Sequence, residues 1–240
     1  MLEWSVYLLI SGLYDSNSKQ GGWILDDYLD NRYMAPYYSY PVFDPEHNWV
    51  DYGGFSNQPN LLAGLMPHLD RDEPELYIWM FFNAWAACYR EEVNAMVEHP
   101  QPVLGSSNSA IYKTSDQANA IKWLRYMYVY ATDSLLHFGR AIPREWFRDG
   151  NEPYAEDVAT RFGKVGVRYV SEVGSGKISA TIDLANRSEP GKTLVRFRHP
   201  VKLPIKSVTV NGAAHDRFDH DKGDVDISGL SGKVEVVAGY

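Results

Sequence analysis

The sequence predicts an α+β fold, in which an N-terminal helical module precedes a small antiparallel β-sandwich. Apolar residues recur at helical spacing in the first part of the chain, whereas they alternate with polar residues in the last part. The composition changes between the same two parts, because all 7 tryptophans lie before residue 150. These differences place a boundary near Asn151–Pro153 and predict two domains, residues 1–152 and residues 153–240.

Charge also separates the two predicted domains. Residues 1–152 contain 10 basic and 20 acidic residues, and residues 153–240 contain 13 basic and 11 acidic residues. The chain has a net charge of −8, which argues against nucleic-acid binding, because that needs a basic surface. Since no run approaches about 20 apolar residues, we expect no membrane span. The start lacks the basic segment of a signal peptide, so we expect a cytoplasmic or a mature secreted protein.

Four segments of the first domain are predicted to be helical. From Asp72, an acidic start with a proline precedes a long apolar run, which indicates a helix that is buried on all sides. Thr114 and Gln117 have the spacing of a capping box and precede apolar residues at helical intervals. Leu2–Tyr14 and Pro143–Phe147 fit two further helices, of which the second is short.

Residues 21–60 have a different composition. They are crowded with Tyr, Asp, Asn and Pro and show no clear helical or strand period. A stretch of this length is either a functional loop or disordered, and its aromatic residues argue against disorder. Aromatic residues make up 14% of the whole chain, which exceeds the usual need of a core, so we interpret this loop as a binding region.

The second domain shows the alternation that is typical of strands. Turn sequences separate the alternating runs, and one of them, Asn211-Gly212, is a hairpin signal. About seven short strands after Pro153 predict a sandwich. The clearest runs cover residues 165–169, 178–184, 194–198, 207–210, 225–227 and 234–237.

Sequence motifs exclude several kinds of site. The chain has one cysteine, Cys88, and 7 histidines without a metal-binding spacing, so we expect no metal site and no cofactor. The acidic segment Asp219–Asp226 lacks the spacing of a calcium loop, and a polar hairpin is the expected structure. Motifs for nucleotide binding and for a nucleophile elbow are absent, which leaves a serine esterase using residues 106–109 as a weaker alternative.

Carboxylates in the first domain are candidates for hydrolytic chemistry. Hydrolysis of a glycosidic bond requires two carboxyl groups, and aromatic side chains pack on sugar rings. Glu98 follows a predicted buried helix that Pro100 ends, so Glu98 should lie at a scaffold end, where catalytic groups are often displayed. His99 is a candidate donor to a ligand hydroxyl. A solvated acidic surface is the alternative, and Asp72 and Glu73 fit helix N-terminal residues better than catalysts.

A family resemblance is carried by segments in both predicted domains, which are Asp26–Tyr33, Leu69–Tyr77, Val97–Pro100, Val195–Pro200 and Ile205–Gly212. Together they resemble the C-terminal part of large bacterial proteins of the six-hairpin glycosidase type. The resemblance covers essentially the whole chain. It implies a partial (α/α)6 toroid followed by a β-sandwich, in the same order as the modules indicated by the sequence pattern.

The resemblance implies hydrolysis of an oligosaccharide or a short glycoside. It makes Glu98 the candidate general base, and Asp27, or else Asp26 or Asp30, the candidate general acid. Hydrolysis is then expected to invert the anomeric centre, with the two carboxyl groups about 6.5–9.5 Å apart to admit a water molecule. The resemblance also implies that carbohydrate subsites are lined by Trp23, Tyr28, Tyr33, Tyr37 and Trp49.

The number of helices departs from this family. A full toroid has twelve helices, and about 150 residues supply perhaps half of them at ordinary helix lengths. The chain is therefore expected to be the end of a longer protein or a homo-oligomer that covers its exposed helix faces. In the first case the acid belongs to a missing part, and a non-catalytic carbohydrate-binding or structural fragment is the alternative function.

Overall fold

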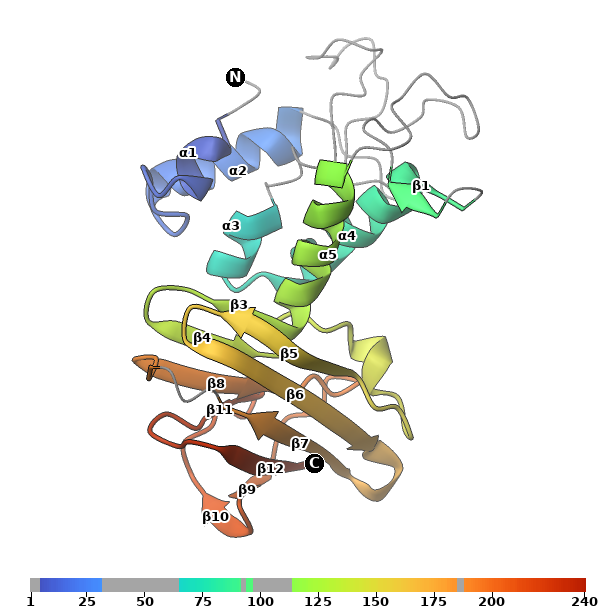
Figure 1. Cartoon of the computed structure of the whole chain (residues 1–240), viewed down its shortest axis with the longest axis vertical. Helices are drawn as coiled ribbons and strands as arrows, with labels where there is room; N and C mark the ends of the chain where they lie inside the picture. The colour runs from blue at the N-terminus through green and yellow to red at the C-terminus, as the bar shows by residue number, and fades with distance from the viewer. Residues whose placement is uncertain (1–4, 32–64, 92–93, 97–113, 185–187) are drawn as a thin grey trace. The chain divides into compact units, whose positions relative to one another are not determined.

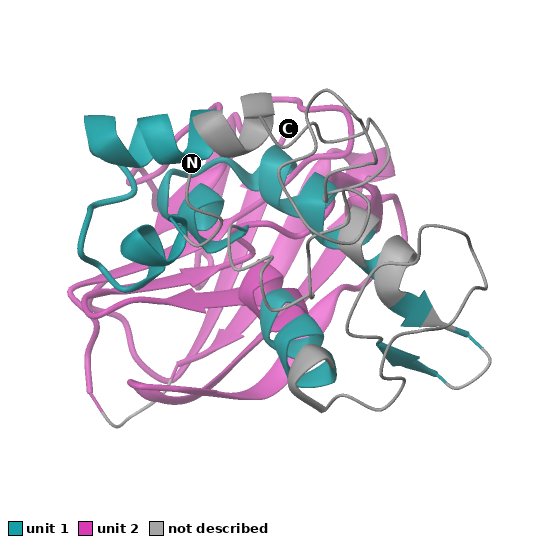
Figure 2. Ribbon diagram, turned by 90° about the horizontal axis from the view of Figure 1, so that it is seen from above, with its two compact units in different colours: residues 1–123 teal, residues 124–240 magenta. Residues whose placement is uncertain are grey.

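The computed structural model describes residues 5–31, 65–91, 94–96, 114–184 and 188–240. The chain divides into two compact units, unit 1 with residues 1–123 and unit 2 with residues 124–240 (Figure 2). Helices dominate the described part of unit 1, and strands dominate unit 2 (Figure 1). The α+β class predicted from the sequence is therefore confirmed.

The division that composition predicts, at residue 152, lies inside unit 2. Strands β3 (Val129–Ala131) and β4 (Leu135–Phe138) precede that position, and β4 pairs with a strand that follows it. The sheet is thus built from both sides of the composition change. The domain organisation into residues 1–152 and 153–240 stays a prediction.

Unit 1 is mainly helical among its described residues. It contains α1 (Tyr7–Ile10), α2 (Lys19–Asn31), α3 (Leu65–Asp70), α4 (Pro74–Cys88), the start of α5 (Thr114–Tyr128), and the strands β1 (Tyr89–Arg90) and β2 (Ala95–Met96). The helices predicted from Asp72 and from Thr114 are confirmed as α4 and α5. The partial toroid stays a prediction. Among the described helices, none is long and apolar enough to cross a membrane.

Helix α4 is apolar on nearly every side but only partly buried, because Phe82 is 40% exposed, so the prediction of a helix buried on all sides is wrong. Pro74 lies in the first turn, where a missing N–H costs no helical hydrogen bond, and Glu75 follows where the helix dipole favours an acid. Tyr77 and Phe81 are buried. The Tyr77 hydroxyl donates to the backbone oxygen of Trp123 at 2.8 Å, so α4 is joined to α5 within unit 1.

The first predicted helix is shorter than the sequence pattern suggested. Helical residues extend only over Tyr7–Ile10, and residues 1–4 lie outside the described part of the chain. Gly12 has a left-handed backbone with φ of 75°, and the N–H of Tyr14 donates to the oxygen of Leu8 at 3.0 Å. Glycine in this conformation ends helices, so the apolar residues up to Tyr14 do not continue α1.

Unit 2 is a sandwich of two sheets. The six-stranded sheet is antiparallel and has the order β10-β9-β12-β7-β6-β5, and the four-stranded sheet has the order β11-β8-β4-β3. The first contains β5 (Tyr154–Thr160), β6 (Gly163–Glu172), β7 (Lys177–Asp183), β9 (Ser207–Val210), β10 (Ala213–His215) and β12 (Lys233–Gly239). The second adds β8 (Lys192–Arg196) and β11 (Asp224–Asp226) to β3 and β4.

The pairing of β4 with β8 corrects the all-antiparallel prediction, because these two strands are parallel. Parallel neighbours require a long crossover connection, and here the chain between them forms β5, β6 and β7 of the other sheet. The sequence pattern also missed β3, β4, β5 and β10. The strands β3, β4 and β10 are too short for a clear alternation, and β5 is interrupted by a bulge between Ala155 and Val158.

The core of the sandwich is formed by the alternating residues that the sequence pattern identified. Val165, Val167 and Tyr169 of β6 are buried, and so are the alternate residues of β7 and β12. The Tyr169 ring packs edge to face on Phe197, which follows β8, with centroids 5.8 Å apart. Contacts of this kind bring the two sheets together.

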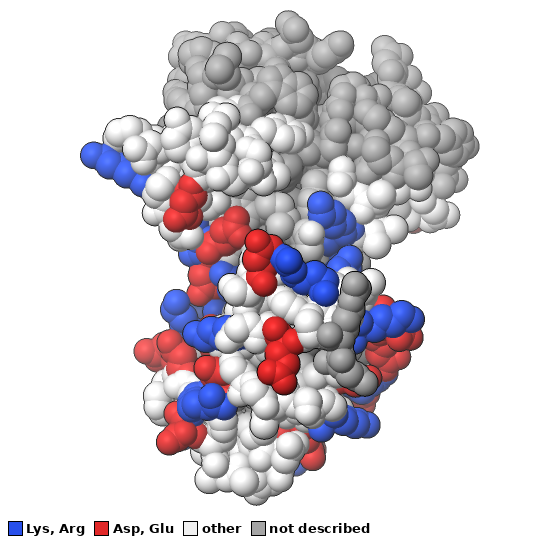
Figure 3. Space-filling view, turned by 60° about the vertical axis from the view of Figure 1, so that its left-hand side comes forward, with Lys and Arg blue, Asp and Glu red and all other residues white. Residues whose placement is uncertain are grey.

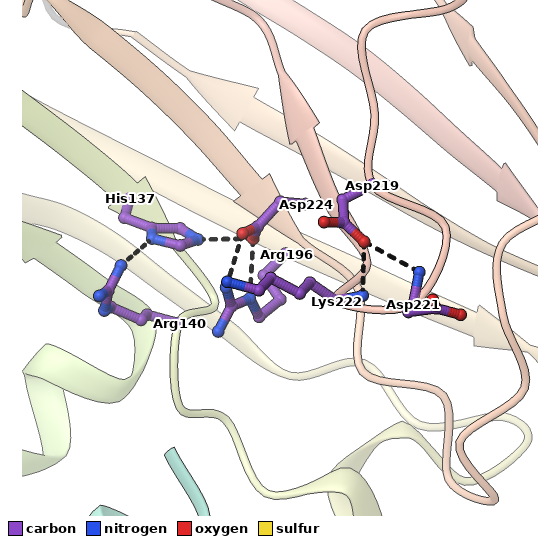
Figure 4. Close-up of polar contacts among 7 residues, drawn as sticks. All are labelled: His137, Arg140, Arg196, Asp219, Asp221, Lys222 and Asp224. Atoms are coloured by element: carbon purple, nitrogen blue, oxygen red, sulfur yellow. Dashed lines mark hydrogen bonds and ion pairs between the residues drawn. The ribbon is translucent and has the colours of Figure 1, made fainter. Parts of the chain in front are cut away.

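Two predicted turns and one short helix are also present. Asn211 and Gly212 connect β9 to β10 with φ angles of 50° and 81°, the left-handed pair that a type I′ hairpin requires. Asp219 accepts hydrogen bonds from the N–H groups of Asp221 and Lys222 at 3.0 and 2.8 Å (Figure 4), which makes the acidic segment a tight polar turn. The short predicted helix is a 3₁₀ helix over Arg144–Phe147.

Candidate functional site

The candidate site residues fall into three groups. Glu98, His99, Tyr33, Tyr37 and Trp49 lie outside the described residues. Asp27, Tyr28 and Asp30 lie on helix α2, where the structure describes their backbone but not their side chains. Trp23 and Asp26 are described with their side chains. Helix α2 therefore carries the candidate residues whose side chains the structure describes.

Helix α2 corrects the prediction that residues 21–60 begin with a loop. The Ser18 side-chain oxygen accepts a hydrogen bond from the N–H of Gly21 at 3.0 Å, and the Ser18 backbone oxygen accepts one from the N–H of Gly22 at 2.9 Å. Serine in this position caps a helix N-terminus. The sequence pattern missed this start because Gly21 and Gly22 are poor helix formers.

Gly21 has a packing reason to be glycine. A Cβ at this position would lie 2.6 Å from the backbone oxygen of Asp15 and 2.7 Å from that of Ser16. Any other residue would therefore collide with the preceding turn. The same turn is held by the Asp15 carboxylate, which accepts from the N–H of Asn17 at 2.9 Å. Gly21 therefore lowers the helix propensity of this segment, but it also permits the close approach between α2 and the turn that precedes it.

One side of α2 carries an acidic and aromatic stripe. Positions 19, 23, 26, 27 and 30 lie on one face of the helix, because residues three and four apart are neighbours along its surface. On this α2 stripe the Trp23 side chain is 58% exposed and Asp26 is exposed, whereas Leu25 on another face is buried. The Lys19 ammonium lies 5.0 Å from the Trp23 ring centroid. Position 28 lies on the opposite side of the helix.

The turn before α2 is tied to the junction between α3 and α4. The Ser16 hydroxyl donates to a carboxylate oxygen of Asp70 at 3.2 Å, and Arg71 donates to the Ser16 backbone oxygen at 3.1 Å. Arg71 also donates to Glu73 at 2.8 Å. Ser16 is buried. These contacts fix the start of α2 to the junction between α3 and α4.

Glu73 has both carboxylate oxygens engaged in this junction. One oxygen accepts from Arg71, and the other is 2.7 Å from Nδ1 of the buried His68. Burial alone would raise the pKa of Glu73, but the hydrogen bonds from His68 and Arg71 outweigh it and hold the pKa below its usual value. Burial lowers the pKa of His68. Glu73 immediately precedes α4, as predicted from the sequence.

A second group of charged residues lies in unit 2 and was not identified from the sequence. This buried cluster consists of His137 on β4, Arg140, Arg196 on β8 and Asp224 on β11 (Figure 4). Arg196 donates two hydrogen bonds to the Asp224 carboxylate, at 2.7 and 2.6 Å. The Nε2 atom of His137 lies 2.9 Å from the same carboxylate. The cluster joins three strands of the four-stranded sheet.

The contacts of His137 determine its protonation state. Arg140 approaches Nδ1 at 2.7 Å, and a guanidinium group can only donate, so Nδ1 must accept and carry no proton. The proton of a neutral imidazole is then on Nε2, which donates it to Asp224. Burial lowers the pKa of His137 to about 4; the neighbouring arginines lower it too, and Asp224 offsets only part of the shift.

Asp224 is the anionic member of the cluster. Burial alone would raise its pKa, but the hydrogen bonds and charges of His137 and Arg196 outweigh burial and hold the pKa well below its usual value. The His137 side chain is fully buried, and both of its ring nitrogens are occupied. A group without a free nitrogen or solvent access cannot exchange a proton with a substrate. The cluster therefore has a structural role in crosslinking the sheet.

The signal for this cluster in the sequence is weak. Arg196 and Arg198 alternate with Val195 and Phe197, which fits a strand with one solvated face. In the structure all four side chains are buried. A buried charge needs a partner, and the partner of Arg196, Asp224, lies far away in the sequence.

No family model matches the sequence, and no curated protein matches it. The chain is similar to the solved structure of Ara127N-Se, a GH127 beta-L-arabinofuranosidase from Geobacillus stearothermophilus T6, with a TM-score of 0.49 and 11% identity over 99% of this chain and 41% of that chain. It is also similar to a solved glycoside hydrolase, with a TM-score of 0.37 and 9% identity over 77% of this chain and 33% of that chain. The chain thus spans less than half the length of either protein.

Proposed function

We propose that the chain is part of a glycoside hydrolase that acts on an oligosaccharide or a short glycoside. Glu98 is the general base, and Asp27, or else Asp26 or Asp30, is the general acid. Trp23, Tyr33, Tyr37, Trp49 and His99 contact the sugar, whereas Tyr28, on the opposite side of α2 from the stripe, is left out of this set. The rest of the site comes from a longer chain or from a second copy of this one, which sedimentation velocity of the purified protein will distinguish.

The α2 stripe is the observation that supports this proposal. It combines an exposed tryptophan with three acidic positions on one helix face, and the helix begins at a turn that is fixed by Ser16 and Arg71. Aromatic rings bind the apolar faces of sugars, and a carboxyl group at the edge of such a platform can protonate the leaving oxygen. Rigid elements place catalytic groups more accurately than loops do.

The decisive experiment assays the full chain on a panel of chromogenic glycosides, arabinofuranosides included. We expect Glu98→Gln to lower kcat by about 10² to 10⁴, the usual contribution of a general base. Glu91→Gln is the matched control, because Glu91 is exposed and close in the sequence. Unchanged melting temperatures will separate loss of chemistry from loss of folding. Turnover that survives in Glu98→Gln would refute the assignment of the base.

The acid has its own test, which depends on the leaving group. Asp27→Asn should nearly abolish cleavage of glycosides with poor leaving groups, since these need protonation. It should spare dinitrophenyl glycosides, whose leaving group departs without a proton. The same comparison for Asp26→Asn and Asp30→Asn selects among the three positions. If no glycoside is cleaved but tryptophan fluorescence changes on addition of sugars, the chain is the non-catalytic carbohydrate-binding fragment instead.

A further inference from the structure

The outward face of the six-stranded sheet contains a hollow. Its lining residues lie between positions 156 and 233, so they share none with the α2 stripe. Its volume is about 430 Å³, and residues of β5, β6, β7 and β12 contribute to it. The residues that line this sheet hollow are Glu156, Asp157, Gly166, Val167, Arg168, Thr181, Asp183 and Lys233. All of them belong to unit 2.

Gly166 of β6 is one of the residues that line the hollow. Val165 and Val167 point into the core of the sandwich, so the alternation of the strand turns position 166 outward. A Cβ here would lie 3.4 Å from the oxygen of Ala155 and 3.8 Å from Cβ of Asp183, which are ordinary contact distances. Gly166 is buried beneath β5, so a side chain larger than a methyl group at this position would extend past these atoms into the hollow that Gly166 lines.

A distortion of β5 forms one side of the hollow. The pairing of β5 with β6 shifts between Ala155 and Val158, and Asp157 has a left-handed backbone with φ of 53°. This conformation is unfavourable for a residue other than glycine, and such residues and β-bulges occur often beside binding sites. The distortion directs Glu156 and Asp157 toward the hollow, which both of them line.

The charges around the hollow nearly balance. Arg168 pairs with Glu156 at 2.8 Å and with Glu152 at 3.6 Å, and its guanidinium lies 4.2 Å from the ring centroid of Tyr154. Lys233 and Asp183 have opposite charges and are register partners on β12 and β7. Basic and acidic side chains are likewise interspersed over the visible face of unit 2 (Figure 3). An ion would gain little net electrostatic attraction from these surroundings. A neutral polar molecule would instead find both hydrogen-bond donors and acceptors.

Several of the lining groups are available for hydrogen bonds. Within the described part of the chain, the side chains of Thr181, Asp183 and Lys233 make no hydrogen bond or ion pair, although all three line the hollow. A hydroxyl, a carboxylate and an ammonium group in one concave surface match the vicinal hydroxyls of a sugar, which both donate and accept.

We propose that the sheet hollow binds a neutral carbohydrate unit, with Asp183 accepting and Lys233 and Arg168 donating hydrogen bonds to its hydroxyls. The choice of a carbohydrate rests on the proposed function, whereas the location rests on Gly166, the bulge and the balanced charges. Binding at this hollow holds a saccharide on unit 2 without taking part in bond cleavage.

The test is an NMR titration of the ¹⁵N-labelled full chain with neutral saccharides, namely glucose, galactose, xylose and arabinose and their short oligosaccharides. We expect amide shifts centred on residues 166, 168, 181 and 183, with millimolar affinity. Gly166→Val fills the hollow, and Asp183→Asn removes the acceptor; each should weaken binding by about tenfold or more, which corresponds to about 1.4 kcal/mol. Asp216→Asn, on the exposed segment before β11, is the matched control and should leave affinity unchanged.

The outcomes separate this proposal from the proposed function. Absence of shifts around Gly166 with every saccharide would overturn it, and so would shifts that persist unchanged in Gly166→Val with a native melting temperature. Binding of glutamate or phosphate in place of sugars would overturn it as well. Saccharide binding that Gly166→Val abolishes, in a protein without glycoside turnover, would support the hollow and refute the hydrolase. Turnover that depends on Glu98, without saccharide binding at the hollow, would support the hydrolase and refute the hollow as a binding site.

Discussion

The two units use acidic residues in opposite ways. On the α2 stripe of unit 1, Asp26 is exposed beside an exposed tryptophan. In the buried cluster of unit 2, the side chain of Asp224 is 15% exposed and is held by Arg196 and His137. The first kind of carboxylate is accessible to a ligand. The second has its hydrogen-bonding capacity consumed by the protein and contributes to stability.

Both residues are aspartates, so the role of each carboxylate depends on its surroundings and not on the residue type. Asp224 lies in a charged network that resembles a catalytic arrangement in composition, since it contains a histidine, an aspartate and two arginines (Figure 4). The network lacks solvent access at His137 and has no unoccupied ring nitrogen. Perturbed pKa values alone would have selected this buried network as a candidate active site.

Removal of Asp224 is expected to produce the largest effect. Asp224→Ala leaves the buried side chains of Arg196 and His137 without their acceptor, so the free energy of unfolding should fall by about 3 to 5 kcal/mol. Urea denaturation measures this change. Asp216→Ala, on the exposed segment before β11, is the control and should change stability by less than about 0.5 kcal/mol. Equal stabilities for the two variants would contradict the structural role of the cluster.

The second prediction concerns acid stability. His137 titrates near its ordinary pKa of 6.5 in the unfolded chain and at about 4 in the folded protein, so the unfolded chain binds the proton first as the pH falls. The contribution of neutral His137 is complete above pH 6.5 and is lost as the pH falls toward 4, by up to about 1.4 kcal/mol per pH unit. Asp224, whose pKa is also lowered, adds a further loss below its ordinary pKa of 3.8.

A variant isolates the histidine in this pH dependence. His137→Gln keeps an acceptor for Arg140 and a donor for Asp224 but cannot titrate. Stability measured from pH 7 to pH 4 should fall less steeply in this variant than in the unchanged protein. His215→Gln, on the edge strand β10, should retain the original slope. A slope that His137→Gln leaves unchanged would assign the acid sensitivity to other groups, such as His68, whose pKa burial also lowers.

The smallest predicted effect tests the rigidity of the α2 stripe. Ser18→Ala removes the acceptor for the N–H of Gly21, which should destabilise the helix by about 1 kcal/mol. Hydrogen exchange of the amides of α2 should accelerate, while the amides of β6 and β7 should exchange at their original rates. Ser175→Ala is a control, because this exposed serine donates only to the oxygen of Glu172, in unit 2. Exchange rates of the α2 amides that do not change in Ser18→Ala would show that Ser18 does not stabilise the start of the helix.

Much of the fold followed from local patterns in the sequence. The alternation in β6, β7 and β12, the apolar run of α4 and the Asn211-Gly212 turn were recognisable because each reflects interactions between residues that are near in the chain. Helix α2 was missed because Gly21 lowers helical propensity, and the reason for that glycine, contact with the oxygen of Asp15, appears only in the folded turn. The short strand β4 depends on a partner that is distant in the sequence, β8, whereas β3 pairs only with the adjacent β4 and is too short to show an alternation.

The candidate site likewise combines features that the sequence predicts with features that depend on the folded structure. Composition and periodicity were sufficient to predict the α+β class, the order of helices before strands and the acidic and aromatic residues near position 26. Three features became visible in the folded chain alone. Trp23 and Asp26 share an exposed helix face, Asp224 pairs with residues 28 and 87 positions away, and Gly166 lines a hollow in a sheet. Exposure and pairing are properties of contacts between distant residues, and the energy of those contacts depends on how completely folding removes water from them.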